Sequence, residues 1–394
     1  MRNTKQIAIN ILWLSHKDVT GGFIYTQNLL DNLFSIDNKN KYTIFLKKSD
    51  FSYFKKRYRT HDNVSLIIID IRKDIVSNPL RAISKFIAKI KNDNEKKEKI
   101  VRKEIQNYIK KVCIDIIFFP SGIIYPKGLE DIKMVSTMYD LQHEYYPENF
   151  SENQVSFKRK EYEYTAQNSD HIIAISNYTK QSIVDKYNIN LDKISVIYLD
   201  AIKLKENAYE NEIKLPEEFI FYPAALWPHK NHKLLVEVLN DLKNKFQNLH
   251  IVFTGITKKK KLKEEIDILI NKYNLSNKVL FLGFVSDETL NFIYKKAKIL
   301  VFPSSFEGFG IPIIEAFINK LPVIAARNSS ISEIVGDAGL LFETNNTEEC
   351  RKCIERILTD RNLRENLIEK GLKRAQDFSW RKTAEQTLVV FENI

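Results

Sequence analysis

The sequence predicts an α/β protein in which parallel β-sheets are covered by helices on both faces. Strand-like and helix-like patterns alternate from one end of the chain to the other, which is typical of parallel sheets. At 394 residues the chain exceeds what one hydrophobic core usually supports. We therefore expect two domains of roughly 150–200 residues each.

The predicted strands fall into two series, separated by a segment that loses periodicity and gains charge. The first series is expected at 6–14, 42–46, 64–70, 114–119, 132–138, 171–175 and 194–198. The second series is expected at 219–222, 250–254, 278–282, 299–302, 321–326 and 339–342. This division predicts a first domain at 1–200, a linker at 201–217 and a second domain at 218–376.

The composition is that of a globular protein with an uneven basic surplus. Hydrophobic residues make up 44% of the chain and charged residues 28%, which argues against extended disorder. The net charge is +11. Residues 1–200 hold 32 lysines and arginines against 24 acidic residues, whereas residues 201–394 hold 29 against 26. The surplus therefore belongs mainly to the first domain.

The three cysteines predict neither a disulfide framework nor a zinc site. Cys113 lies in an apolar strand pattern, where a buried thiol is expected. Cys350 and Cys353 have zinc-like spacing without a second pair, and are more simply neighbours on one helix face. We expect a reducing, cytoplasmic setting. The apolar run 7–14 is interpreted as a first core strand rather than a signal peptide, and no stretch approaches the ~20 residues that cross a bilayer.

Two basic segments leave two interpretations open. Lys47–Arg59 contains six cations interleaved with aromatic residues, and 81–111 is a lysine-rich helical region. Such a run is usually a solvated face, but it can also lie on anionic lipid at the inner face of a membrane, each cation contributing about 1 kcal/mol. No recognition motif accompanies the charge, so nucleic acid is not an expected partner.

A glycine-rich turn at 304–315 carries two carboxylates, Glu307 and Glu315, eight positions apart. A buried strand precedes the turn and a helix follows it, so the turn lies at the carboxyl end of a strand. Its glycines let the backbone approach a ligand, and the helix start offers free N–H groups to a phosphate. We expect Glu315, in the first helical turn, to accept hydrogen bonds from ribose hydroxyls. The arrangement suits a sugar attached to a diphosphate, and the residues predicted to bind this ligand in the turn are Gly308, Phe309, Gly310 and Ile311.

This string resembles the Glu-x7-Glu signature of the retaining glycosyltransferases of family 4. The resemblance implies the GT-B fold, which has two Rossmann-like domains facing a central cleft. It implies that Glu307 lies by the donor sugar and Glu315 binds the nucleotide ribose. It also implies that the last segment, 377–394, is a helix that crosses back to the first domain.

A second loop, 222–232, follows the first strand of the second domain and precedes a helix. Lys230 can neutralise a diphosphate there, and Asn231 can cap the helix. The alternative is a solvated lysine between surface histidines. The loop resembles the donor-phosphate loop of the family, in which an Arg-Lys pair is common. Because His229 stands where arginine is frequent, we expect phosphate binding to depend more heavily on Lys230.

Three other segments also resemble the family, although their sequence patterns are less specific. The turn after 279–282 resembles one that meets the nucleobase, which implies base contacts for Phe284 and Val285. Gly21 and Gly22 open the first helix and resemble the family's amino-terminal glycine loop, which implies that Gly21 lines the acceptor side and that Gly22 approaches the donor phosphates. The acceptor-side segment of Tyr139, Asp140 and His143 resembles one that often reads His-Asp-Leu. Tyr139 replaces that histidine, and His143, one helical turn away, is a candidate to compensate.

The resemblance implies a retaining glycosyltransferase that moves a hexose from a nucleotide diphosphate sugar to a glycan or lipid-linked glycan. The sequence of 221–232 resembles the corresponding segment of bacterial cell-surface polysaccharide enzymes. GDP-mannose is therefore the first expected donor, with rhamnose or another hexose as alternatives. No Asp-x-Asp metal site is present in the sequence, and no metal or other cofactor is expected. Two other functions stay open, a nucleotide-sugar epimerase on the same fold and a noncatalytic basic binding protein.

Overall fold

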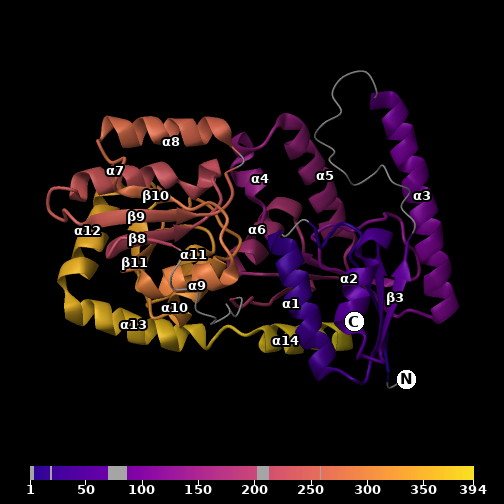
Figure 1. The fold of residues 1–394 in the computed structure, drawn as a ribbon. Helices are drawn as coiled ribbons and strands as arrows, with labels where there is room; N and C mark the ends of the chain where they lie inside the picture. The colour runs from indigo at the N-terminus through magenta and orange to yellow at the C-terminus, as the bar shows by residue number, and fades with distance from the viewer. Residues whose placement is uncertain (1–3, 18–19, 70–86, 202–212, 258) are drawn as a thin grey trace.

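Each half of the chain forms its own parallel β-sheet with helices on both faces (Figure 1). The computed structural model describes residues 4–17, 20–69, 87–201, 213–257 and 259–394. Most of the predicted linker, 202–212, and the start of the basic segment 81–111 lie outside these residues. The predicted fold class, two Rossmann-like domains, is confirmed.

The first sheet is built from short apolar runs that are buried between helices, as a parallel sheet requires. Its strand order is β3-β2-β1-β4-β5-β6-β7. The register sets Ile9 of β1 beside Ile44 and Phe118. The strands are β1 (Gln6–Asn10), β2 (Lys41–Leu46), β3 (Val64–Ile68), β4 (Ile116–Phe119), β5 (Lys133–Met138), β6 (His171–Ala174) and β7 (Ile194–Val196).

The helices of the first domain connect these strands. They are α1 (Gly21–Ile36), α2 (Lys48–Tyr58), α3 (Ile87–Val112), α4 (Gln142–Tyr145), α5 (Glu152–Asn168) and α6 (Asn177–Tyr187), with short 3-10 turns η1 (Pro147–Asn149) and η2 (Leu191–Lys193). Cys113 follows α3 instead of lying in a strand. It has a φ of 55° and is exposed, so the expectation of a buried thiol is wrong.

The second sheet has the order β10-β9-β8-β11-β12-β13. Its strands are β8 (Glu218–Pro223), β9 (Leu249–Thr254), β10 (Val279–Phe281), β11 (Ile299–Phe302), β12 (Val323–Arg327) and β13 (Leu340–Glu343). Its helices are η3 (Pro228–Lys230), α7 (His232–Leu242), α8 (Lys260–Lys272), α9 (Asp287–Lys296), α10 (Ile311–Ile318), α11 (Ile331–Val335), α12 (Thr347–Thr359) and α13 (Arg361–Ala375). Cys350 and Cys353 are both buried on α12.

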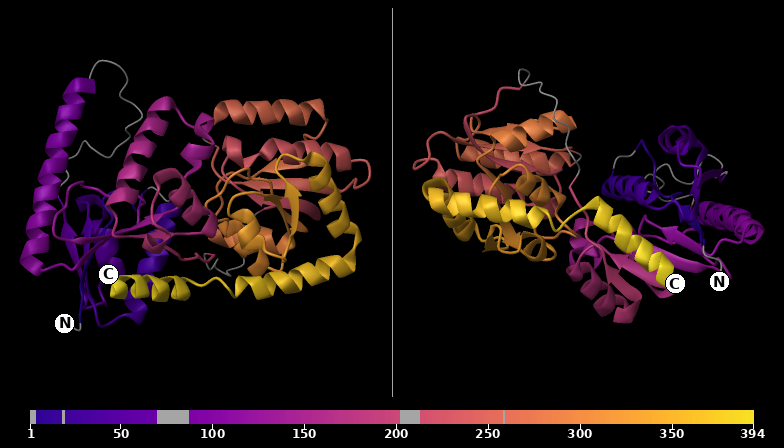
Figure 2. Two further views of the ribbon diagram at one scale, coloured as in Figure 1. Left: turned by 180° about the vertical axis from the view of Figure 1, so that it is seen from behind. Right: turned by 90° about the horizontal axis from the view of Figure 1, so that it is seen from below.

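The last helix, α14 (Trp380–Asn393), leaves the second domain and packs against α1 of the first (Figure 2). The indole N–H of Trp380 donates to the carbonyl of Ala201 at 3.0 Å. Near the other end of α14, the ammonium of Lys5 donates to the carbonyl of Phe391 at 2.6 Å. The carboxyl-terminal helix therefore ties the two domains together.

Loops at the carboxyl ends of the two sheets also meet directly. Phe306, from the loop after β11, is buried against three tyrosines of the first domain, with ring centroids 5.7–5.8 Å apart; these are Tyr145, Tyr146 and Tyr178. The hydroxyl of Tyr146 also donates to the carbonyl of Ser305 at 3.3 Å. This contact brings the first domain onto the loop that carries the predicted Glu-x7-Glu string.

Candidate active site

The two predicted donor loops follow neighbouring strands, β8 and β11, and are bonded to each other. The N–H of Ser305 donates to the carbonyl of His229 at 2.7 Å. The hydroxyl of Tyr222, at the end of β8, lies 2.9 Å from the carbonyl of Lys230 and 2.8 Å from the hydroxyl of Ser304. The loops therefore form one unit at the carboxyl ends of the two central strands of the second sheet.

Lys230 and Glu307 are in contact. The Nζ of Lys230 lies 2.5 Å from Oε1 of Glu307, and both side chains are mostly buried, with 19% and 14% exposed. The Nζ also lies 5.9 Å from the centroid of the Phe302 ring. The cation proposed for the diphosphate is thus paired with the carboxylate proposed for the sugar, and a diphosphate at Lys230 would compete with Glu307 for the ammonium.

Two serines hold the backbone of Glu307. The N–H of Glu307 donates to the hydroxyl oxygen of Ser329 at 3.0 Å. The hydroxyl of Ser330 lies 2.9 Å from the carbonyl of Glu307 and 3.0 Å from that of Phe309. The loop is therefore attached to the start of α11 on both sides of Gly308.

Glu315 is a buried carboxyl that accepts a hydrogen bond from the hydroxyl of Tyr294 at 2.7 Å. Burial raises its pKa to about 7, and the Tyr294 bond opposes that rise only in part. Glu315 lies in the second turn of α10, so its expected place in the first turn is wrong. A carboxyl in this setting is poised between its neutral and ionised forms at neutral pH.

The start of α10 leaves its backbone groups without a side-chain cap. The residue before the helix is Gly310, whose φ of 117° favours glycine, and Ile311 opens the helix. Phe309 is buried against the rings of Tyr198 and Phe378. Any donor contact of Phe309 would therefore come from its backbone.

Gly308 meets the first domain rather than open space. A Cβ at this position would overlap the carbonyl oxygen of Tyr139 and lie 3.1 Å from the Cβ of Asp140. Across the same contact, a Cβ at Gly22 would lie 3.3 Å from the Tyr139 ring, whereas one at Gly21 would have no atom within 4 Å. The structure thus brings four of the predicted site residues together, namely Gly22, Tyr139, Asp140 and Gly308.

The hydroxyl of Tyr139 is not suited to proton transfer. Its hydroxyl donates to the carbonyl of Pro120, and burial raises its pKa well above the usual value. His143 is fully buried, with its ring 4.8 Å from that of Tyr162 and its Nε2 3.3 Å from the hydroxyl of Tyr187. Burial lowers its pKa to about 3. His143 therefore does not stand in for the missing histidine.

His229 and Asn231 differ from the sequence-based interpretation. Burial, aided by the neighbouring Lys230, lowers the pKa of His229 to about 3, so it carries no charge at neutral pH. Asn231 precedes α7 but makes no side-chain cap bond, so the predicted capping role is wrong. It has left-handed backbone geometry, and its Nδ2 donates to Oδ1 of Asn345 at 2.9 Å.

Phe284 and Val285 lie in the loop after β10, beyond a glycine, Gly283, whose φ is 68°. Phe284 is 80% exposed, which leaves its ring accessible for stacking, while Val285 packs partly on the core. The sequence does not single out the residues that hold the loops, which are Tyr222, Tyr294, Ser304, Ser329 and Ser330. Their partners are distant in sequence, so no local spacing signals them.

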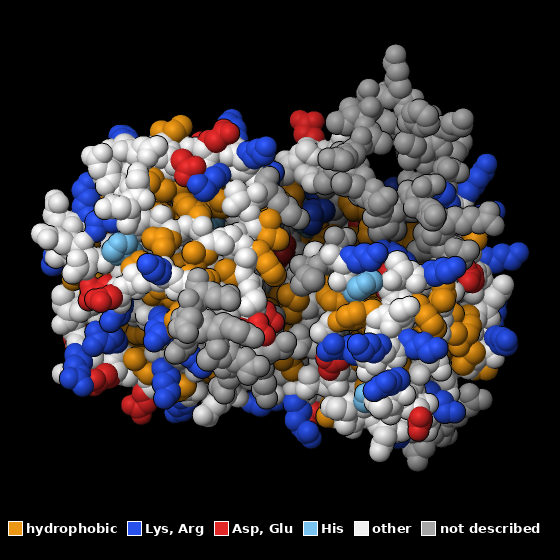
Figure 3. All heavy atoms as spheres, in the orientation of Figure 1, with side chains coloured by type: hydrophobic (Ala, Val, Ile, Leu, Met, Phe, Trp, Pro, Cys, Tyr) orange, Lys and Arg blue, Asp and Glu red, His pale blue; other side chains and the backbone are white. Residues whose placement is uncertain are grey.

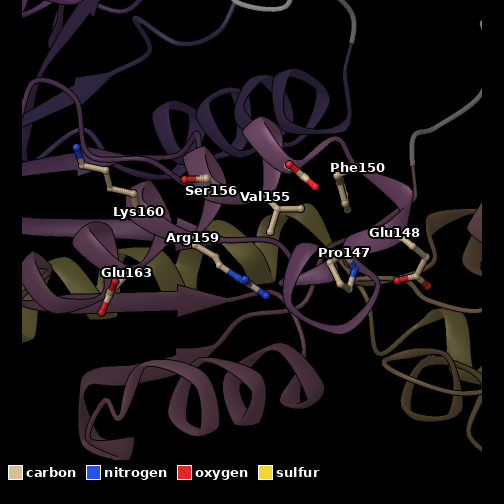
Figure 4. A pocket seen from close by; sticks show the side chains of 9 residues that line it. Pro147, Glu148, Phe150, Val155, Ser156, Arg159, Lys160 and Glu163 are labelled. Atoms are coloured by element: carbon tan, nitrogen blue, oxygen red, sulfur yellow. The ribbon is translucent and has the colours of Figure 1, made fainter.

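Two grooves lie outside the centre of this site. One, of about 660 Å³, is lined by η1 and by α5 as far as Glu163, and contains none of the predicted site residues; Pro147 and Arg159 are also among its lining (Figure 4). The other, of about 630 Å³, lies between the starts of α7 and α8. Asn231 lines it together with Trp227 and lysines of α8.

The predicted membrane-facing segment, Lys47–Arg59, turns its aromatic residues inward. Phe54 and Tyr58 are buried, Tyr53 stacks on His16, and Phe51 packs partly on the core. Figure 3 shows lysine and arginine side chains over both halves of the molecule with acidic ones among them. This segment could therefore meet an anionic surface through its cations but not through its aromatic rings, and α3 presents further exposed lysines, among them Lys103 and Lys110.

The residues described contain no helix that is both long and apolar enough to pass through a membrane. Within the same residues, no group of three or more His, Cys, Asp or Glu side chains is placed to hold a metal ion.

The two Rossmann-like domains, with loops that meet at the carboxyl ends of their strands, have the architecture of the GT-B fold. Residues 205–374 match the family model of glycosyl transferases group 1, and residues 88–199 match that of glycosyltransferase family 4. Together these matches span more than half of the chain. The chain belongs to glycosyltransferase family 4.

Similar proteins agree with this assignment. The O-antigen chain mannosyltransferase B of Escherichia coli is 26% identical over 71% of this chain and 74% of its own length. The serotype-specific mannosyltransferase WbdA of Escherichia coli is 27% identical over 57% of this chain. The matched region makes up only 29% of the length of WbdA. A glycosyltransferase structure from Rickettsia africae has a TM-score of 0.70 and 19% identity, with 99% of this chain and 98% of that one covered. The similarity to this last structure shows that the two proteins share a fold.

Proposed function

We propose that this glycosyltransferase moves mannose from GDP-mannose to a glycan or lipid-linked glycan during O-antigen or related polysaccharide synthesis. The observation that carries the proposal is the contact of Lys230 with Glu307 in two bonded loops beside the start of α10. The mannosyltransferase names of the relatives support the choice of sugar. Rhamnose or another hexose is the alternative within the same reaction.

In the proposed reaction, the bond between the sugar C1 and the diphosphate oxygen breaks, and the acceptor hydroxyl oxygen forms a bond to C1 on the same face. The leaving diphosphate takes the acceptor proton, so the anomeric configuration is retained. Lys230 and the N–H groups at the start of α10 stabilise the negative charge that develops on the diphosphate. Glu307 orients the sugar, and Glu315 binds the ribose. The proposed scheme includes no metal ion.

The acceptor would approach from the first domain, where Gly22, Tyr139 and Asp140 lie close to Gly308. His229 is neutral, so the charge of the diphosphate falls to Lys230 rather than to a pair of cations. Contact with an anionic membrane through the cations of α2 is an additional proposal, based on charge alone.

A binding screen by ligand-observed NMR tests the donor site. GDP-, UDP- and dTDP-linked sugars are compared on the wild type, on Lys230→Ala and Glu315→Ala, and on Lys233→Ala. Lys233 serves as a matched control because it pairs with Glu265 on α8 rather than with the proposed site. The proposal expects one donor to bind, with loss only in the first two variants. Binding of no donor, or equal binding in all variants, would favour a noncatalytic protein.

A further inference from the structure

Glu333 lies on α11 of the second domain and binds the start of α6 in the first. Its Oε1 accepts from the N–H of Asn177 at 2.8 Å and from the Nδ2 of Asn177 at 2.7 Å. Its Oε2 accepts from the N–H of Tyr178 at 3.3 Å. Asn177 and Tyr178 are the first residues of α6, where backbone N–H groups lack helical partners and favour a negative charge. A carboxylate of one domain therefore completes a helix of the other.

Tyr198 adds a further bond to the same carboxylate. Its hydroxyl donates to Oε1 of Glu333 at 2.6 Å and also accepts from Nδ2 of Asn177 at 2.9 Å. Burial and the Glu333 carboxylate together raise the pKa of Tyr198 to about 12, so it remains a donor at neutral pH. Tyr198 follows β7, on the chain that leads out of the first domain. The carboxylate thus contacts both α6 and the exit of the first domain.

The second domain fixes Glu333 from behind. The guanidinium of Arg374, on α13, donates from Nη2 to the carbonyl of Glu333 at 2.6 Å and from Nε to that of Ile334 at 3.1 Å. Arg374 also lies over the ring of Phe378, 4.9 Å from its centroid. Arg374 therefore holds the backbone of α11 at Glu333 in place. The side chain of Glu333 extends from this fixed backbone and binds the first domain.

The same short helix is attached to the loop of Glu307. Ser329 and Ser330, which bond the backbone of Glu307 and Phe309, immediately precede α11, and Glu333 follows three residues later. The Glu307 loop is thus bonded to the residues just before α11, and the first domain is bonded to Glu333 in the first turn of α11. A shift of α6 relative to α11 would move the acceptor side relative to Glu307.

We infer that Glu333 is a positioning residue, which holds the first domain against the second so that the acceptor side meets the Glu307 loop. The inference rests on the proposed transfer reaction. Donor contacts are proposed mainly on the second domain, whereas Glu333 acts between the domains. Loss of Glu333 should therefore slow transfer without weakening donor binding, because misplaced reactants lose much of the rate gained by orientation.

The test compares Glu333→Gln, Glu333→Asp and the control Glu343→Gln. Gln presents an amide group to the N–H donors of α6, whereas Asp keeps the charge on a shorter side chain. Glu343 pairs with Arg327 on the neighbouring strand of the same domain, 3.0 Å away and largely exposed. Donor affinity, kcat and small-angle X-ray scattering are measured on the full chain.

We expect Glu333→Gln to lower kcat at least tenfold, with donor affinity within twofold of the wild type and an increased radius of gyration. Glu333→Asp should recover part of kcat, and Glu343→Gln should match the wild type. An unchanged kcat, or a parallel loss of kcat and donor affinity, would overturn the inference. If the wild type transfers no sugar, the proposed function fails, and scattering still decides the inference: an unchanged radius of gyration in Glu333→Gln contradicts it.

Discussion

The ammonium of Lys230 and the carboxylate of Glu307 form an ion pair at 2.5 Å, although they belong to loops 77 residues apart in sequence. Neither side chain is left as an unpaired buried charge, which would be costly. Replacement of the carboxylate by a diphosphate would keep the ammonium paired and release Glu307 toward a sugar. The pair therefore explains how one site can be stable without donor and still offer both groups to it.

Lys230→Ala is expected to weaken binding of the free nucleoside diphosphate by roughly 10- to 100-fold, because it removes a charge-assisted hydrogen bond to phosphate. Isothermal titration calorimetry on the wild type, Lys230→Ala and Lys233→Ala measures the change. Equal affinity in the wild type and Lys230→Ala would contradict the phosphate-binding role.

Glu315→Gln is expected to stabilise the folded protein at alkaline pH. The folded pKa is raised from 4.5 to about 7, so the folded protein binds more protons than the unfolded chain between these values. Stability is therefore lost as pH rises through that window, and the neutral amide avoids the loss while still accepting from Tyr294. Urea unfolding should show a gain of roughly 1–3 kcal/mol at pH 8 and little difference at pH 4. The same difference at both pH values would refute burial as the cause.

Gly308→Ala is expected to separate the two domains locally, because its Cβ would overlap the carbonyl oxygen of Tyr139. We expect transfer to fall by roughly 10- to 100-fold, since misplacement of reacting groups by about 1 Å has effects of that size. Nucleotide affinity should fall less than transfer, because a donor contact of Gly308 would come from its backbone, which alanine keeps. Steady-state kinetics combined with calorimetry separates the two quantities, and full transfer activity in the variant would be the opposing result.

Chelation is expected to leave transfer intact, because the proposed scheme assigns the diphosphate charge to Lys230 and the start of α10. The measurement is the initial rate before and after incubation with EDTA and gel filtration. A lost rate that Mg²⁺ or Mn²⁺ restores would show that a metal takes part.

The sequence predicts the fold well because the strands are local apolar runs. The strand at 299–302 is reproduced without change, and the others differ at their ends by a few residues. The largest difference, at 6–14, arises because Asn10 ends β1 and its Nδ2 donates to the carbonyl of Tyr125. Patterns of apolar residues do not reveal where a polar side chain finds such a distant partner.

The candidate site was predicted in its parts but not in its contacts. The position of these residues in loops after buried strands, together with the resemblance to family 4, pointed to Glu307, Glu315 and Lys230. The structure adds that Lys230 and Glu307 are paired and that Glu315 is buried against Tyr294. The burial of His143 depends on the packing of α4 against α5, which a single sequence does not specify. The bond between Glu333 and Asn177 joins positions 156 residues apart, beyond any local signal.

The most direct test of the account is mannosyl transfer from GDP-mannose to a panel of lipid-linked and soluble oligosaccharides, with the anomeric configuration of the product read by NMR. Wild type is compared with Glu307→Gln and with the control Glu343→Gln. The account predicts a product with the configuration of the donor, formed by the wild type and the control and strongly reduced in Glu307→Gln. A product of inverted configuration, or transfer that is indifferent to Glu307, would contradict it.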